Sequence, residues 1–208
     1  DPFLRDTFVP LAAGGTCCVI DNNEMLLDPG RFKEWIDHND ITLMHIVPSL
    51  FKLLVNEIKD DDCFEKLEYI LLAGELLRGE DIRTFIEIFK RRIELANLYG
   101  PAETTMSKSF YRVKEADARK SIIPVGKPLP GAQTVILDEN MKICLTGNVG
   151  EIYIRTPFRS AGYIGDPELT KKVFIKNPYG NNPKDIIYKT GDLGKLLGDG
   201  NMEVLGRV

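Results

Sequence analysis

The chain has 208 residues, of which 43% are hydrophobic and 28% are charged, with a formal net charge of −4. This composition is enough for a packed core under an ordinary charged surface, and the acidic balance argues against a general nucleic-acid binder. The charge is uneven: residues 1–108 carry 12 Lys/Arg and 20 Asp/Glu, whereas residues 109–208 carry 15 and 11. We therefore expect two structural units of different surface character.

Strands and helices alternate in the first half of the sequence. Residues 3–12 have apolar side chains at helical spacing and predict a packed helix, and residues 16–20 predict a buried strand. Further strands are expected at 43–47, 69–72 and 94–98. Further helices are expected to start at Pro29 and Pro48 and to cover 79–92. Lys90–Arg92 would lie in the last turn of that helix, where cations complement the helix dipole.

The pattern changes after about residue 108. Short strands are expected at 133–137, 150–155, 186–189 and 202–205, separated by turn sequences rich in Asp, Asn and Gly. Only residues 168–174 have a helical pattern in this half. The predicted fold class is therefore α/β. A parallel sheet layered with helices, residues 1–108, is followed by a smaller β-rich subdomain with a distorted barrel, residues 109–208.

The four cysteines, Cys17, Cys18, Cys63 and Cys144, show neither metal-ligand spacing nor a disulfide framework. We expect Cys17 and Cys18 to be small buried hydrophobes of a cytoplasmic, reducing compartment. The longest apolar stretch, residues 41–55, is shorter and more broken than the ~20 residues that span a bilayer, so no membrane segment is expected. No signal peptide is visible, and we expect the native N-terminus to lie upstream.

The stretch at 97–107, Asn-Leu-Tyr-Gly-Pro-Ala-Glu-Thr-Thr-Met-Ser, carries the densest chemistry. A strand that ends in a Gly-Pro bend presents the next residues at the edge of a sheet, where a ligand can reach them. Tyr99 offers a flat face for a purine, Asn97 has donor and acceptor atoms for its edge, and Glu103 is a hard oxygen ligand for Mg²⁺. The hydroxyls that can donate to phosphate oxygens are those of Thr104 and Thr105.

Ordered motifs along the chain resemble the core motifs of adenylate-forming enzymes, most closely the amino-acid adenylation domains of nonribosomal peptide synthetases. Besides 97–107 they are Gly-Glu-Ile-Tyr-Ile at 150–154, residues 161–170, Tyr-Lys-Thr-Gly-Asp-Leu at 188–193 and Glu-Val-Leu-Gly-Arg at 203–207. The resemblance covers residues 1–208, and its strength lies in the order of the motifs, since no single one is specific.

The resemblance implies an ATP-dependent, AMP-forming ligase. It would activate an amino acid and load it onto the phosphopantetheine thiol of a peptidyl carrier protein domain. By this resemblance, ATP would be bound by Gly74, Glu75, Asn97, Tyr99, Gly100, Asp192 and Arg207. Asp192 would accept hydrogen bonds from the ribose hydroxyls, and Glu103 would bind Mg²⁺ and act catalytically with Thr104. Ala102 departs from the pattern, because the family often has a hydroxyl residue there.

The resemblance also implies a pocket for the amino acid. Its residues would be Asp1, Pro2, Arg5, His45, Leu71, Ala73, Leu98, Met106 and Ser107. Asp1 would pair with the α-ammonium of the substrate, which favours an amino acid over a fatty or aryl acid. Arg5 lies one helical turn later and needs a neutralising partner if it is buried. A substrate acceptor beside His45 would favour an acidic or strongly polar amino acid. Pairing of Arg5 with Asp6 or another acid would instead leave the pocket apolar, lined by Leu71, Leu98 and Met106.

Two features of the family are absent from the sequence: a Ser/Thr/Gly-rich phosphate loop and the lysine of a small C-terminal subdomain. No Walker-type or GxGxxG motif replaces them. We therefore expect the central part of an adenylation domain, whose N-terminal and C-terminal parts are its partners. Two alternatives stay open, an acyl-CoA or aryl-acid ligase of the same superfamily and a non-catalytic scaffold. A role of Asp1 in substrate choice, and a carrier domain in the flanking sequence, would separate them.

Overall fold

The computed structural model describes residues 2–20, 23–90 and 92–208. It confirms the expected α/β fold class. One sheet contains both parallel and antiparallel strand pairs, and the other sheet is antiparallel. The chain forms two compact units: unit 1 comprises residues 1–97 and 112–123, and unit 2 comprises residues 98–111 and 124–208. Strands β3 (Glu94–Tyr99) and β4 (Ser109–Arg112) contribute residues to both units. The first sheet has the strand order β1-β2-β3-β4-β5.

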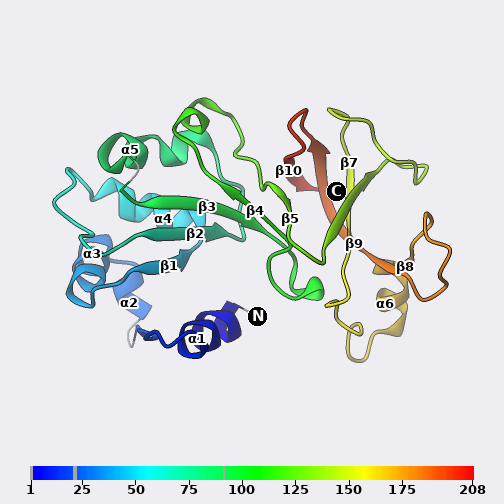
Figure 1. The fold of residues 1–208 in the computed structure, drawn as a ribbon, viewed down its shortest axis with the longest axis horizontal. Helices are drawn as coiled ribbons and strands as arrows, with labels where there is room; N and C mark the ends of the chain where they lie inside the picture. Colours follow the sequence, from blue (N-terminus) through cyan, green and yellow to red (C-terminus); the bar gives the residue numbers. More distant parts are fainter. Residues whose placement is uncertain (1, 21–22, 91) are drawn as a thin grey trace. The chain divides into compact units, whose positions relative to one another are not determined.

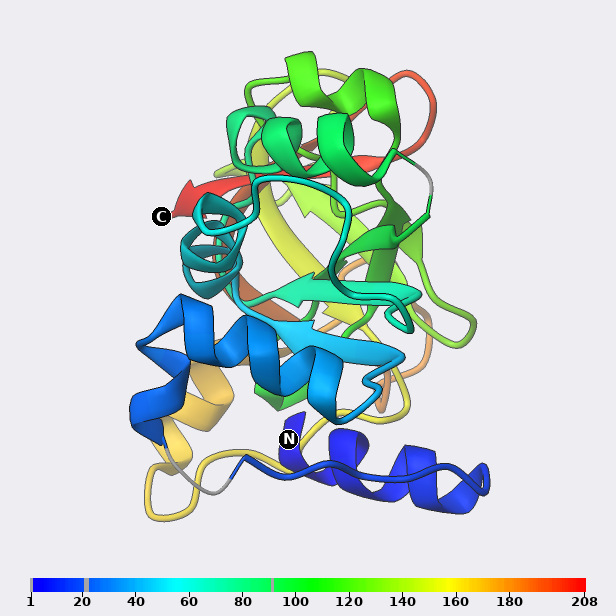
Figure 2. The same cartoon turned by 90° about the vertical axis from the view of Figure 1, so that its left-hand side faces the viewer.

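Unit 1 contains two parallel strands and a layer of helices. The strands are β1 (Leu43–Ile46) and β2 (Tyr69–Ala73), in a register that sets His45 opposite Leu71. The helices are α1 (Pro2–Ala12), α2 (Asn23–Leu26), α3 (Pro29–His38), α4 (Pro48–Asn56) and α5 (Gly79–Phe89), with a 3₁₀ turn, η2 (Glu115–Arg119). Figure 2 shows α3, α4 and α5 at increasing height around β1 and β2, with α1 apart from them at the bottom. None of the described helices is long and apolar enough to cross a membrane.

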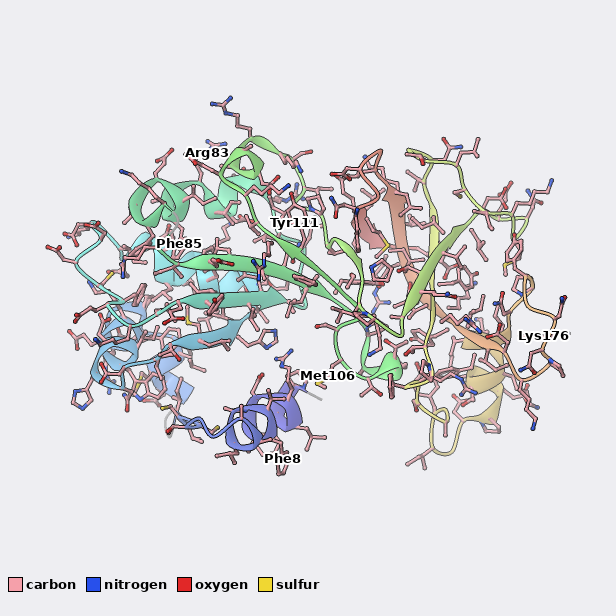
Figure 3. All side chains as sticks on the ribbon, in the orientation of Figure 1. Phe8, Arg83, Phe85, Met106, Tyr111 and Lys176 are labelled. Carbon is pink, nitrogen blue, oxygen red and sulfur yellow. The ribbon has the colours of Figure 1, made fainter. Side chains whose placement is uncertain are left out.

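The two faces of β2 have different surroundings. Ile70 and Leu72 are fully buried, whereas Leu71 and Ala73 are half-buried. Because side chains alternate along a strand, Ile70 and Leu72 share the face that is packed into the core. The rings of Phe51 on α4 and Phe85 on α5 belong to this core, with centroids 5.2 Å apart. Phe85 is labelled in Figure 3. The opposite face of the sheet carries Leu71 and Ala73 of β2, together with His45 of β1, which is the register partner of Leu71.

The helix starts predicted in unit 1 are confirmed. Asp28 caps α3, and its Oδ1 accepts a hydrogen bond from the Arg31 N–H at 3.1 Å, with Pro29 at the first helical position. Pro48 likewise begins α4, whose Phe51, Leu54 and Val55 are buried.

Three expectations for the N-terminal segment are wrong. Residues 16–20 form no strand, because no described strand pairs with them. Helix α1 exists but has no buried residue, and Phe8, labelled in Figure 3, is 59% exposed. Cys17 is half-buried and Cys18 is exposed rather than buried, whereas Cys63 is in the core.

The end of α5 also differs from the prediction. The helix stops at Phe89, and Lys90 follows it with a φ of 52°, so Lys90 and Arg92 do not lie in its last turn. Arg91 lies outside the described residues. Arg92 donates instead to three backbone carbonyls of the loop between α4 and β2, those of Phe64 at 2.7 Å, Cys63 at 2.6 Å and Asp61 at 3.2 Å. The guanidinium therefore holds that loop, where five fixed donors are of more use than a single positive charge.

Unit 2 is built on the second sheet, with the antiparallel order β10-β9-β7-β6 and β8 paired to β9. Figure 1 shows β7, β9 and β10 side by side. Its elements are β5 (Lys127–Pro128), β6 (Gln133–Leu137), β7 (Gly150–Arg155), α6 (Pro167–Val173), β8 (Phe174–Lys176), β9 (Ile186–Leu196), β10 (Met202–Arg207) and a 3₁₀ turn, η1 (Ala102–Thr104). β9 is longer than expected, because it pairs with β8 at its start and with β10 at its end.

Unit 2 has two clusters of buried hydrophobic side chains. One is formed by Val125, Ile136, Ile152, Ile154 and Met202, and the other by Leu137, Tyr153 and Ile187. Met202 exchanges backbone hydrogen bonds with Val125 and Gly126 at 2.8 and 2.9 Å. Gly126 has a φ of +82°, and a Cβ added there would lie 1.8 Å from the carbonyl oxygen of Phe110. Two backbone segments thus meet at a point that only glycine permits.

Candidate active site

The loop that follows β3, residues 100–107, is called the central loop below. Thr104 is fully buried, and its Oγ1 donates to the carbonyl of Pro101 at 2.9 Å. Thr105 and Met106 both have a φ of 61°, a left-handed conformation that is uncommon outside glycine. Thr105 Oγ1 donates to the carbonyl of Phe158 at 2.6 Å. Both threonine hydroxyls are therefore bound to backbone in this structure, and they fix the shape of the loop.

Glu103 lies at the centre of this loop. Its carbonyl accepts from the Ser160 N–H at 2.7 Å, and its Oε1 accepts from the hydroxyl of Tyr163. Burial alone would raise the pKa of Glu103, but hydrogen bonds from Tyr163, from its own backbone and from Tyr188 lower it below its ordinary value. The carboxylate is thus held ionised on a fixed loop.

A second cluster in unit 2 joins three distant motifs. β9 and β10 pair in a register that sets Asp192 opposite Arg207. The two oxygens of Asp192 have different partners, with Tyr99 Oη donating to Oδ2 at 2.7 Å and Arg207 Nε lying 3.2 Å from Oδ1. The carboxylate side chain is 15% exposed and that of Arg207 is 77% exposed. Burial, and then the hydrogen bond to Asp192, raise the pKa of Tyr99, so its hydroxyl stays a donor.

The remaining residues expected to bind nucleotide lie in unit 1 or at its end. Glu75 accepts from the backbone N–H and the hydroxyl of Ser49, at 2.8 and 2.9 Å. Gly74, with a φ of +91°, precedes it at the end of β2. Asn97 is 2% exposed, and its Nδ2 donates to the carbonyl of Ile123 at 3.2 Å. Gly100 opens the central loop in unit 2.

The residues expected to line the amino-acid pocket are divided between the units. Asp1 lies outside the described residues. Unit 1 contains Pro2, Arg5, His45, Leu71 and Ala73. Unit 2 contains Leu98, Met106 and Ser107, all half-buried; Met106 is labelled on the central loop in Figure 3. Within unit 1 the structure brings Arg5 to His45, and it sets His45 beside Leu71 on one face of the sheet.

His45 forms a polar cluster with Arg5 and Asp6. Arg5 Nε lies 2.7 Å from Asp6 Oδ1, and Arg5 Nη2 contacts His45 Nδ1. Because arginine only donates, Nδ1 is the acceptor and the imidazole proton is assigned to Nε2. Among the described residues, the buried Nε2 has no hydrogen-bond partner. Burial lowers the pKa of His45 and the neighbouring Arg5 lowers it further, so the ring is neutral near pH 7.

The donor set fits magnesium in one particular way. No group of three His, Cys, Asp or Glu side chains converges within the described residues. Mg²⁺ in phosphate-transferring sites is held by one or two carboxylates, and substrate phosphates and water supply the other ligands. A single ionised carboxylate on a fixed loop, as at Glu103, fits that arrangement.

Sequence reasoning missed several partners of the expected residues. Tyr163 and Tyr188 lie inside two of the recognised motifs, and a phenol within each motif was the available signal. Asp6 was expected only as one of two partners of Arg5, and the structure shows that contact. Ser49 gave no signal, because its contact with Glu75 joins residues 26 positions apart.

Comparison with known proteins identifies a family for this chain, since residues 3–164 match the AMP-binding enzyme family. Bacitracin synthase 1 of Bacillus licheniformis is 34% identical over 208 residues, covering all of this chain and 4% of the synthase. L-2-aminoadipate reductase of Schizosaccharomyces pombe is 29% identical over 235 aligned residues, covering all of this chain and 16% of the reductase. The chain thus spans a small fraction of the curated relatives it matches.

Solved structures agree with the sequence comparison. The crystal structure of CmiS6 superposes with a TM-score of 0.85 at 29% identity, covering 96% of this chain and 48% of that one. PA1221, described as an NRPS protein containing adenylation and PCP domains, superposes with a TM-score of 0.77 at 28% identity, covering 86% and 36%. With its motifs, its fold and a family match over most of its length, this chain belongs to the AMP-binding enzyme family.

Proposed function

We propose that the chain is part of an ATP-dependent adenylation domain that activates an amino acid. A carboxylate oxygen of the amino acid attacks the α-phosphorus of ATP, and the bond to pyrophosphate breaks. The thiol of a phosphopantetheine arm on a peptidyl carrier protein then attacks the aminoacyl-adenylate, and AMP leaves as the thiol proton is lost. The observation that carries this proposal is the meeting of Tyr99, Asp192 and Arg207, which unites an aromatic ring, a carboxylate and a cation.

These three side chains suit the parts of AMP. The ring of Tyr99 would stack on adenine, and Asp192 would accept hydrogen bonds from the two ribose hydroxyls. Arg207 is exposed enough to turn from Asp192 toward ribose or phosphate. Gly74, Glu75, Asn97 and Gly100 would complete the adenine site. Support comes from the family match and from the likeness to PA1221, which is described as an NRPS protein containing adenylation and PCP domains.

The central loop would supply the reacting part of the site. Glu103 would hold Mg²⁺, which when bound neutralises charge on the phosphates. Thr104 would keep Glu103 in place, because its buried hydroxyl closes the turn on which Glu103 lies. Ala102 has no hydroxyl to offer, so any donor at that position is a backbone N–H.

The cluster around His45 favours a polar amino acid among the possible substrates. A buried Nε2–H without an acceptor is costly, and a substrate oxygen would supply the acceptor. Asp6 neutralises the charge of Arg5, as expected if the pocket is apolar, but Arg5 Nη2 still contacts His45 Nδ1 and orients the imidazole ring. We therefore propose a substrate whose side chain ends in an acceptor oxygen. One relative is named for L-2-aminoadipate, whose side chain ends in a carboxylate.

Amino-acid-dependent exchange of pyrophosphate into ATP tests this function. The protein that carries this chain is assayed with the twenty amino acids and 2-aminoadipate, and in parallel with fatty and aryl acids. We expect exchange with an amino acid that has a side-chain oxygen. A preference for leucine or phenylalanine would refute the polar pocket, and turnover of only fatty or aryl acids would favour the related ligases. Absence of both exchange and ATP binding would favour a scaffold.

Transfer to the carrier is tested separately. A radiolabelled amino acid, ATP and the carrier domain are mixed with the enzyme, and protein-bound label is measured after precipitation. Label is expected on the carrier that bears phosphopantetheine and not on the same carrier without it. Equal labelling of the two carriers would exclude the thiol as the acceptor.

A further inference from the structure

A segment of unit 2, residues 158–163, holds the central loop by hydrogen bonds and is called the brace below. It contacts the loop at three points. The Ser160 N–H donates to the Glu103 carbonyl at 2.7 Å, and Thr105 Oγ1 donates to the Phe158 carbonyl at 2.6 Å. At the third point the hydroxyl of Tyr163 donates to Glu103 Oε1. Two of the contacts fix the backbone, and only the third fixes the carboxylate.

Tyr163 is itself held rigidly. Its N–H donates to Thr170 Oγ1 at 2.8 Å, and Thr170 lies in α6. Its ring packs against Phe174 with centroids 6.3 Å apart, and Phe174 packs against Tyr188 at 5.0 Å. Gly162 allows this arrangement, since a Cβ there would lie 2.4 Å from Thr170 Cγ2. The phenol therefore reaches Glu103 from a packed aromatic cluster and not from a mobile side chain.

A rigid donor matters for a glutamate because the side chain has three rotatable bonds. Left to itself, the carboxylate samples several staggered conformers, and only some suit a metal that needs near-ideal octahedral geometry. A hydrogen bond to one oxygen selects one of these conformers before the ligand arrives. Loss of a hydrogen-bonding partner of a metal ligand typically costs roughly 10- to 100-fold in metal affinity or activity.

We propose that Tyr163 is a positioning residue that holds the Glu103 carboxylate in the orientation in which it binds Mg²⁺·ATP. The inference rests on the proposed function of Glu103 as the magnesium ligand and adds a residue that does not touch the substrate. The brace, α6 and β8 then support the central loop, which gives the motif at 161–170 a physical role.

The test compares Tyr163→Phe with the wild type. Phenylalanine keeps the ring packing on Phe174 and removes only the hydroxyl. Binding of ATP to the protein that carries this chain is measured by calorimetry with and without Mg²⁺. Tyr163→Phe should weaken Mg²⁺·ATP binding roughly tenfold or more, while metal-free ATP binds as before. In the exchange assay kcat should fall, with the KM for the amino acid unchanged.

Two further variants make the outcomes distinct. Tyr179→Phe removes a phenol hydroxyl that donates to the Met141 carbonyl at 2.5 Å, away from Glu103, and should change neither measurement. Glu103→Gln should abolish the difference between ATP with and without Mg²⁺. If Glu103→Gln does so and Tyr163→Phe binds Mg²⁺·ATP like the wild type, the positioning role is refuted. If Glu103→Gln changes nothing, the proposed role of Glu103 itself fails. Equal weakening of ATP binding with and without metal by Tyr163→Phe would indicate a general structural role and would also refute the inference.

Discussion

At the scale of single residues, the Asp192 carboxylate has hydrogen-bonding partners in the free protein and can still bind a ligand. Its two oxygens are engaged by Tyr99 and Arg207, so it is not left unpaired before a ligand binds. One of the two partners, Arg207, is largely exposed, and its Nη1 also donates to the carbonyl of Thr190 at 2.9 Å. A ribose that displaces Arg207 would exchange one charge-assisted contact for another. Binding then depends on the carboxylate and less on the rearrangement.

We predict that Asp192→Asn raises the KM for ATP more than the KM for the amino acid. Hydrogen bonds to a charged group contribute about 1.5–3 kcal/mol, which corresponds to a rise of roughly 10- to 150-fold. Steady-state exchange kinetics with each substrate varied in turn would measure both constants. Glu139→Gln, at an exposed turn of the same unit, is the matched control. Unchanged ATP kinetics in Asp192→Asn would remove this residue from the ribose site.

His45 gives a prediction about pH. Its pKa is lowered from 6.5 by burial and by Arg5, against the opposing effect of Asp6. The unfolded chain therefore takes up this proton at a higher pH than the folded protein does. Above about pH 6.5 the ring is neutral in both states, and its titration does not change the free energy of unfolding. As pH falls below that value, the free energy of unfolding should decrease until the ring is also protonated in the folded protein.

Urea denaturation between pH 7.5 and 5 would show this effect. The wild type should lose stability over that range, and His45→Gln should lose less. His38→Gln, which changes the other histidine of the chain, should behave like the wild type. An identical pH dependence in wild type and His45→Gln would show that another group is responsible.

At the scale of elements, the start of α3 depends on one side chain. Asp28 Oδ1 accepts from the Arg31 N–H, one of the four N–H groups that a helix leaves free at its N-terminus. We predict that Asp28→Ala lowers the free energy of unfolding by about 1 kcal/mol, measured by chemical denaturation followed by circular dichroism. Asp28→Asn keeps the acceptor and should be close to the wild type. Equal losses in the two variants would argue against the cap.

The elements that could be predicted are those whose causes lie in neighbouring residues. Pro29 and Pro48 start helices because a cap and a fixed φ act within one turn. The strand expected at 16–20 is wrong because a strand needs a partner, which the sequence does not name. The role of Arg92 was missed for the same reason, since its acceptors lie 28, 29 and 31 residues away.

The candidate site divides in the same way. Glu103 and Asp192 stand in ordered motifs and could be named from the sequence, whereas the donors that hold them come from afar. Tyr163 is 60 residues from Glu103, and Tyr99 is 93 residues from Asp192. Chemistry can therefore be recognised locally, but the contacts that position it appear only with the fold.

At the scale of the whole molecule, a ligand that binds only the folded state should stabilise the chain. At 100 times its dissociation constant it contributes about 2.7 kcal/mol, whichever contacts it makes. We predict that Mg²⁺·ATP raises the midpoint of thermal unfolding, followed by the fluorescence of the single tryptophan, Trp35. Asp192→Asn should reduce the rise at the same ATP concentration. No rise at saturating ATP in the wild type would contradict nucleotide binding by this chain.

The contact at Gly126 bears on how this chain can vary. A Cβ at that position would meet the Phe110 carbonyl at 1.8 Å, and the φ of +82° is strained for any other residue. Gly165 also has a positive φ, but no atom of the described part of the chain lies within 4 Å of a Cβ placed there. In a saturation library selected for folding, we expect position 126 to remain glycine and position 165 to accept asparagine or aspartate. Two glycines that look alike in the sequence would thus differ in the substitutions that they tolerate during evolution.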